Sequence, residues 1–121
     1  MTKKIYSDPV ALLPLSPAVF HILLSLSEGE RHGYALKREI ARRTGGKLNL
    51  GPGVLYSSIA KLLDQALIEE SEDRPDPHLD DERRRYYRLT PFGRRVAQAE
   101  AVRMRDLVQL AAANLGLPQP V

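Results

Sequence analysis

Residues 51–89 constrain the fold of this chain more than any other stretch, because they join a helix-forming run to a charged segment enclosed by two short strand-like runs. Apolar side chains recur at helical spacing in the first part and predict one buried stripe along a helix. These positions are Leu55, Ile59, Leu62, Leu63 and Ala66. The second part predicts a β-hairpin, in which residues 67–68 begin one strand and residues 84–89 form the other.

Alternation along the returning strand predicts which of its side chains face the core. We expect Tyr87 and Leu89 to point inward, and Arg84, Tyr86 and Arg88 to point outward. A helix that leads into such a hairpin is typical of a recognition helix with a wing.

The helix face opposite the apolar stripe is narrow, lightly charged and rich in short hydroxyl side chains. Its members are Val54, Ser57, Ser58, Lys61, Asp64 and Gln65. A solvated face more often carries several Glu and Lys residues, whereas a helix in the major groove of DNA touches base edges with short side chains. The pattern therefore favours a helix that reads DNA.

Cap residues, prolines and glycines place three further helices. We expect them from Ser16 toward Gly29, from Gly33 or Tyr34 to about Thr44, and from Thr90 to about Leu115. The predicted fold is mainly α with a small β-hairpin, a winged helix-turn-helix plus a C-terminal helix. It divides into an N-terminal arm over residues 1–15, the DNA-binding domain over residues 16–89 and a dimerisation helix over residues 90–117.

The C-terminal helix carries small and apolar side chains at spacings of 4, 3, 4, 3 and 4 residues. These positions are Ala97, Ala101, Met104, Val108, Ala111 and Leu115. This is the a/d spacing of a coiled-coil seam. An exposed apolar stripe of this length is unfavourable in a monomer, so the pattern favours a homodimer. The alternative is that the helix folds back onto its own domain.

Charge is distributed unevenly along the 121 residues, although the net charge is only +3. Residues 69–82 hold eight of the fifteen acidic residues and one of the eighteen basic ones. The rest of the chain therefore has 17 basic and 7 acidic residues. A basic body of this kind favours a polyanionic partner such as double-stranded DNA. An Arg-rich surface without such a partner is the alternative.

Several classes of protein are disfavoured by the composition. The absence of cysteine excludes a disulfide framework and a thiolate metal site, and favours the cytoplasm. Prolines interrupt the apolar segment near the N-terminus, and no run approaches the roughly 20 residues that span a bilayer. His21, His32 and His78 are too scattered for a metal site, and residues 76–81 are more often a solvated loop than a weak cation site. No catalytic constellation can be assembled, so we expect neither an enzyme nor a cofactor.

Short motifs follow one another in a fixed order along the chain: Leu23-Leu24, His32-Gly33-Tyr34-Ala35-Leu36, Gly51-Pro52-Gly53-Val54-Leu55-Tyr56, Leu62-Leu63, Leu67-Ile68, Tyr86-Tyr87-Arg88-Leu89-Thr90 and Gly93. By these motifs the chain resembles, over roughly residues 15–115, the PadR family of bacterial transcriptional regulators. This resemblance has consequences for fold and function. It implies a winged helix-turn-helix of the short type, which dimerises through one C-terminal helix. It also implies repression by operator binding, relieved in some members by a small-molecule effector.

Two departures from the family pattern matter. Ser57 and Ser58 stand where the family commonly has Pro and Ala, so no base preference can be carried over. Residues 74–82 are unusually acidic, which argues against deep insertion of the wing between phosphates.

Seven residues are predicted to contact DNA: Tyr34, Arg38, Gly53, Tyr56, Ser57, Lys61 and Arg84. Gly53 lets the backbone approach the duplex at a helix N-terminus, where free N–H groups attract a phosphate. The Tyr56 hydroxyl reaches a phosphate if its ring packs, Ser57 and Lys61 face the groove, and Tyr34 and Arg38 lie on the helix that crosses the backbone. The competing interpretations are that Gly53 only helps to form the turn, that Tyr56 is purely structural and that Lys61 is an ordinary solvated side chain.

For Arg84 and Arg88 a different role competes with DNA binding. They stand opposite Glu69, Glu70 and Glu72 across the predicted hairpin, so cross-strand ion pairs compete with contacts to DNA. The sequence thus predicts a homodimeric repressor on a pseudo-palindromic operator, with half-sites about one helical turn apart. A winged-helix module for protein association, with the acidic hairpin as its docking surface, is the alternative.

Overall fold

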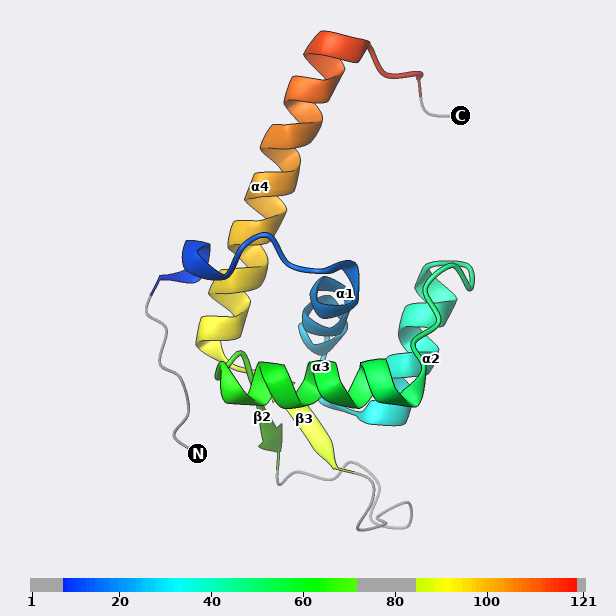
Figure 1. Ribbon diagram of the computed structural model, residues 1–121, viewed down its shortest axis with the longest axis vertical. Helices are drawn as coiled ribbons and strands as arrows, with labels where there is room; N and C mark the ends of the chain where they lie inside the picture. Colours follow the sequence, from blue (N-terminus) through cyan, green and yellow to red (C-terminus); the bar gives the residue numbers. More distant parts are fainter. Residues whose placement is uncertain (1–7, 72–84, 120–121) are drawn as a thin grey trace.

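The computed structural model describes residues 8–71 and 85–119. A helical body and a small sheet lie together, and the C-terminal helix extends away from them (Figure 1). The elements in chain order are η1 (Pro9–Leu12), α1 (Pro17–Leu26), β1 (Arg31–His32), α2 (Gly33–Arg43), α3 (Pro52–Asp64), β2 (Ile68–Ser71), β3 (Tyr86–Leu89) and α4 (Pro91–Leu115).

The helices begin where the cap residues predicted. The Ser16 hydroxyl accepts a hydrogen bond from the Val19 N–H at 3.2 Å, and the Thr90 hydroxyl accepts one from the Gly93 N–H at 2.9 Å. Each bond satisfies a peptide donor that a helix start would otherwise leave without a partner. The ring of His32 does the same for α2, a role that the sequence did not indicate.

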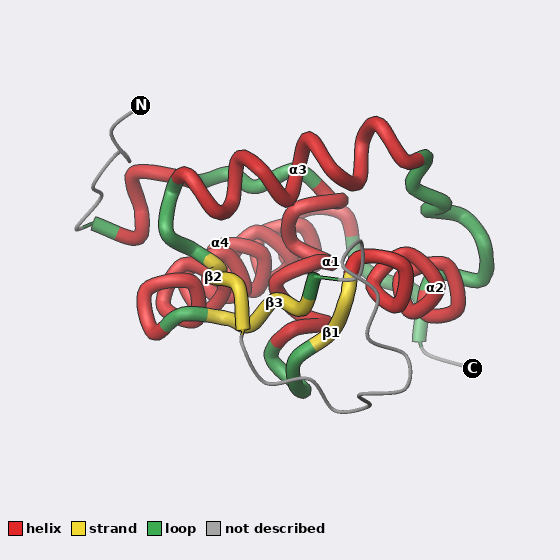
Figure 2. Tube along the Cα trace, turned by 90° about the horizontal axis from the view of Figure 1, so that it is seen from below, coloured by secondary structure: helices red, strands yellow, loops and turns green. Residues whose placement is uncertain are grey.

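The sheet has three antiparallel strands in the order β1-β3-β2, so the prediction of a two-stranded hairpin was incomplete (Figure 2). The two-residue strand β1 is too short to show period-2 alternation, which explains why the sequence did not reveal it. β3 is therefore the central strand of the sheet.

Tyr86, which was expected to point outward into solvent, is buried instead. This residue is only 6% exposed, because it pairs with His32 of β1 and the two rings meet edge to face with centroids 5.5 Å apart. Tyr87 belongs to the main core, as expected. Successive residues of β3 point to opposite faces, and the short added strand supplies a side chain that covers the second face.

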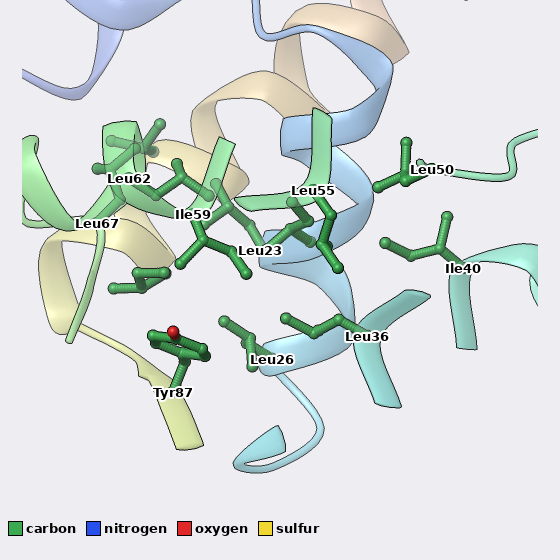
Figure 3. Packing of buried hydrophobic residues seen from close by; sticks show 13 residues of the cluster. Leu23, Leu26, Leu36, Ile40, Leu50, Leu55, Ile59, Leu62, Leu67 and Tyr87 are labelled. Atoms are coloured by element: carbon green, nitrogen blue, oxygen red, sulfur yellow. The ribbon is translucent and has the colours of Figure 1, made fainter. Parts of the chain in front are cut away.

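The core joins α1, α2, α3 and the sheet, with Leu23 and Leu26 of α1 facing Leu36 of α2 and Tyr87 of β3 (Figure 3). The α3 stripe is confirmed in its main part: Leu55, Ile59 and Leu62 are buried and Leu63 is half-buried. Ala66 does not belong to it, because α3 ends at Asp64 and Ala66 lies in the following turn with φ of +59°.

The helix α4 has two different halves. Its first turns pack against the body, where Gly93, Val96 and Glu100 are buried. No described residue after Glu100 is buried, and the helix continues outward to Leu115 (Figure 1). The part of the N-terminal arm that the structure describes lies against α4 through η1, a contact that the sequence did not predict.

Candidate nucleic-acid interface

The first turn of α3 is an open helix end. Gly51, Pro52, Gly53 and Val54 are all exposed, and the N-cap Gly51 provides no side-chain hydrogen bond. The other described helices, η1, α1, α2 and α4, each have a side chain that accepts a hydrogen bond from the first turn. A Cβ on Gly53 would meet nothing within 4 Å. This turn can therefore approach another molecule closely with its own N–H groups.

Tyr56 connects this turn to α2. Its ring and hydroxyl lie against Gly33, where a Cβ would be 3.2 Å from both Tyr56 Cε1 and the hydroxyl oxygen. Half of the Tyr56 side chain stays exposed. Tyr56 is thus packed on one side and half exposed on the other, an arrangement compatible with a contact to phosphate. Sequence reasoning missed Gly33, because nothing local in the sequence shows that a ring from α3 reaches it.

Tyr34 and Arg38 stand together on the exposed side of α2. Tyr34 is 57% exposed, and the Arg38 guanidinium lies 5.7 Å from the centroid of its ring, within the range of a cation–π contact. Arg38 has no ion pair with any other described residue, and it lines an open hollow on this side of α2 together with Arg31 and His32.

Two other arginines of α2 are engaged by an acid. Arg42 and Arg43 both pair with Glu39, at 2.5 Å and 3.0 Å, and these hydrogen bonds lower the pKa of Glu39 to about 2. Arg43 also pairs with Glu28. At neutral pH, two cations of α2 are thus matched by acidic neighbours, while Arg38 remains available for a phosphate.

Ser57 and Lys61 are exposed on α3, as predicted. The Ser57 hydroxyl donates to the Val54 carbonyl at 3.2 Å, so its remaining capacity toward a partner is as an acceptor. Lys61 lies two turns beyond Gly53 and lines a groove with residues of the arm and α1. Val54, which the sequence placed on the same outward face, is 53% exposed and offers an apolar contact.

The base of the wing is occupied by ion pairs. Arg88 donates to Glu69 at 2.8 Å, and Arg85 donates to Glu70 at 2.9 Å. For Arg88 the cross-strand alternative is therefore the arrangement observed. Arg84 lies outside the described residues.

Most of the outer half of α4 is exposed and apolar. Of the predicted seam, Ala101, Val108 and Leu115 are exposed, whereas Ala97, Met104 and Ala111 are partly buried. Leu107 and Leu110 widen the exposed face. At its base, Ala97 and Ala101 line a groove of α1 and α4 with Phe20 and Leu24. This face is available to an apolar partner.

The parts of the chain that the structure describes contain neither a membrane-spanning helix nor a cluster of metal-binding side chains. No helix there has the length and apolarity that crossing a membrane requires. Nor do three or more His, Asp or Glu side chains gather there in a group that could hold a metal ion. The acidic segment at residues 76–81 lies outside the described ranges.

Comparison with known proteins finds a relative of similar sequence. It is 35% identical over 86 residues to an uncharacterized 37.1 kDa protein in transposon TN4556 of Streptomyces fradiae, covering 71% of this chain and 22% of that protein. The chain thus spans only about a fifth of the length of this relative.

Solved structures share the fold. A PadR family transcription regulator from Clostridium difficile R20291 superposes with a TM-score of 0.66 at 20% identity, covering 84% of this chain and all of that one. RosR from H. salinarum gives a TM-score of 0.58 at 28% identity, covering 85% of this chain and 98% of that one.

A family match decides the assignment. Residues 22–99 match the transcriptional regulator PadR-like family, and they include the second half of α1, the sheet, α2, α3 and the start of α4. Because this match covers more than half of the chain, the chain belongs to the PadR-like family of transcriptional regulators.

Proposed function

We propose that this chain is a repressor that binds a pseudo-palindromic operator in double-stranded DNA as a homodimer. Membership of a family of transcriptional regulators supports a regulatory role rather than an enzymatic one. The observation that carries the proposal is the open first turn of α3, which is exposed over Gly51 to Val54 and has no capping side chain.

Recognition would combine groups on α3 and α2. The outward side chains of α3, Ser57 and Lys61, meet base edges, while the free N–H groups of its first turn approach a phosphate. Tyr56 and Arg38, held by Gly33 and Tyr34, supply further phosphate contacts on the flank. Contacts to phosphate position the protein, and contacts to bases specify the sequence.

The outer half of α4 would join two copies. Its exposed apolar side chains have no partner within the described chain, and Val108 alone is 54% exposed. Pairing this face with the same face of a second copy, by two-fold symmetry, removes it from water. Two α3 helices would then address two half-sites of one duplex.

DNA binding is tested with a duplex that carries the promoter of the chain's own gene. Affinity, measured by fluorescence anisotropy, should fall by on the order of a thousandfold between about 50 and 200 mM salt if six or more phosphates are contacted. A random duplex of equal length is the control. Absence of salt-dependent binding to the promoter fragment would contradict the proposal.

Two substitutions on α3 separate base contacts from backbone contacts. Lys61→Ala should weaken operator binding more than random-duplex binding if Lys61 reads a base, and equally if it holds a phosphate. Ser57→Glu places a negative charge on the same face and should reduce binding at least tenfold. Arg105→Ala, a loss of one charge on the outer half of α4, is the matched control. A fully tolerated Ser57→Glu would instead favour a protein-association module.

The dimer has a separate test. Replacing both Met104 and Val108 with Glu puts charges into the proposed seam, and light scattering should then report a monomer. Gln109→Glu, on the same exposed half of the helix, should leave the dimer intact. An unchanged mass in the double variant would refute this seam.

A small-molecule effector would bind in the groove of α1 and α4. Its lining is mainly apolar, with Phe20 and Leu24 on one side, Ala97 and Ala101 on the other, and Arg94 among the polar groups. An occupant here would touch both the body and the helix proposed to form the dimer. Release of the promoter duplex by a compound, lost in Leu24→Glu but not in Gln109→Glu, would support this site.

A further inference from the structure

Glu100 is a fully buried acid on a helix that is otherwise largely exposed beyond its first turns. Its side chain is 0% exposed, and its Oε2 atom accepts a hydrogen bond from the Leu15 N–H at 2.7 Å. Its Oε1 atom pairs with Arg103 one turn further along α4. Both carboxylate oxygens are therefore engaged, one by the arm and one by the helix.

Burial of a carboxylate costs free energy unless its charge is compensated. Here the Arg103 guanidinium and the Leu15 N–H lower the pKa of Glu100 despite its desolvation, so the group is a carboxylate at neutral pH. An apolar side chain would fill the same space without this requirement. What Glu100 adds is a directional bond between two segments 85 positions apart in the sequence.

The hydrogen bond between Leu15 and Glu100 joins the start of α1 to the point where α4 leaves the body. Leu15 directly precedes Ser16, the N-cap of α1, so its N–H belongs to the junction between the arm and the body. Glu100 is the last buried residue of α4. The next fifteen residues run outward to Leu115, which corresponds to about 22 Å of helix. The bond is thus the last buried attachment before α4 leaves the body.

Because the projecting part of α4 is long, a small tilt at Glu100 produces a large displacement at its far end. A tilt of about 10° at Glu100 would move the far end by about 4 Å for a helix of this length. One base pair of DNA advances by about 3.4 Å. A tilt of this size at the attachment would therefore shift the two α3 helices of the proposed dimer relative to one another by about one base pair.

We infer that Glu100 is a positioning residue: by holding the Leu15 N–H it fixes the angle at which α4 leaves the body, and thereby the half-site spacing that the dimer accepts. The inference rests on the proposed function, because it needs both a dimer and an operator. It assigns Glu100 no contact with DNA.

The first test uses duplexes with two copies of a half-site selected from random DNA, at the preferred spacing and at one and two base pairs more or less. The wild-type chain should prefer one spacing at least tenfold. In Glu100→Ala the preference should fall below threefold, with unchanged affinity for a single half-site. Glu100→Gln keeps an acceptor for Leu15 and should retain most of the preference. A folded Glu100→Ala dimer with wild-type selectivity would overturn the inference.

A second test needs no DNA and remains decisive if Glu100→Ala does not fold. The chain has no cysteine, so Asn49→Cys introduces one spin label per protomer on the exposed connection between α2 and α3. The distance distribution between the two labels of a dimer should be narrow in the labelled chain that carries Asn49→Cys alone. It should be about twice as wide when Leu15→Pro is added, which removes the donor N–H and the leucine side chain and also fixes φ at this position. Leu15→Ala keeps the N–H and is the matched control.

The two tests distinguish the possible failures. Equal widths for Leu15→Pro and Leu15→Ala would overturn the role of Glu100 even if the operator is bound normally. Failure of the chain to bind any duplex, with broadening in Leu15→Pro alone, would refute the proposed function but keep the attachment. Absence of any distance between labels would refute the dimer and the inference together.

Discussion

The helices α3 and α4 both begin with proline at their first position, yet they begin in opposite surroundings. α3 starts at the surface, without a capping side chain, and ends within the body. α4 starts within the body, where the Thr90 hydroxyl accepts from the Gly93 N–H and donates to the Ala66 carbonyl at 2.7 Å, and it ends in the open.

The glycine in each first turn shows the difference most directly. A Cβ on Gly53 would meet open space, whereas a Cβ on Gly93 would lie 1.9 Å from the Leu67 carbonyl oxygen. The same residue type therefore faces open space in α3 and permits close packing within the chain in α4. The surroundings of the first turn, open space or packed backbone, therefore decide what the glycine in that turn does.

The largest expected effect sharpens this contrast. Gly93→Ala forces a backbone shift at the junction with Leu67 and should reduce the free energy of unfolding by about 3 kcal/mol. Gly53→Ala, its matched control, should leave stability unchanged or slightly raised, because alanine favours a helix, while DNA binding weakens. Urea unfolding of both variants measures this. Equal stability losses would show that the two helix starts are equivalent.

The cap of α4 should come next in size. Thr90→Ala leaves the Gly93 N–H without its acceptor and the Ala66 carbonyl without its donor. The expected loss is about 1.5 kcal/mol in the free energy of unfolding. Thr90→Ser keeps the hydroxyl and should recover most of it in the same measurement. A Thr90→Ala variant as stable as the wild type would show that the hydroxyl does not hold this junction.

A smaller gain is expected where α3 ends. Ala66 adopts φ of +59°, a left-handed conformation that is unfavourable for alanine. Ala66→Gly should raise the free energy of unfolding by roughly 0.7 kcal/mol, because the relief of backbone strain exceeds the cost of the greater conformational entropy of glycine in the unfolded chain. Ala60→Gly, on the exposed side of α3, should do the opposite, and a loss in both variants would contradict this explanation.

The smallest change would close the open end of α3. Gly51→Ser supplies a side-chain acceptor and should raise stability by about 0.3 kcal/mol. It should also weaken operator binding, because the hydroxyl competes with a phosphate for the same N–H groups. Thermal unfolding and anisotropy on one preparation report both effects. Tighter operator binding would indicate that this helix end does not meet a phosphate.

Local signals predicted the helices well. The Ser16 and Thr90 caps, the glycines after α2 and the apolar stripe of α3 appear in the structure where the sequence placed them, because each depends on residues within one or two turns. The errors concern β3 and the end of α3. Tyr86 is covered by the distant His32, and Ala66 leaves the helix to reach Thr90.

The sequence by itself determined where helices start, which faces are apolar and that the chain carries PadR motifs, since short-range spacing encodes all three. Only the tertiary structure decided that Tyr56 packs on Gly33 and that Glu100 binds the Leu15 N–H. Both contacts join segments far apart in the chain. Their existence depends on how the helices pack, a property that periodicity along one segment does not contain.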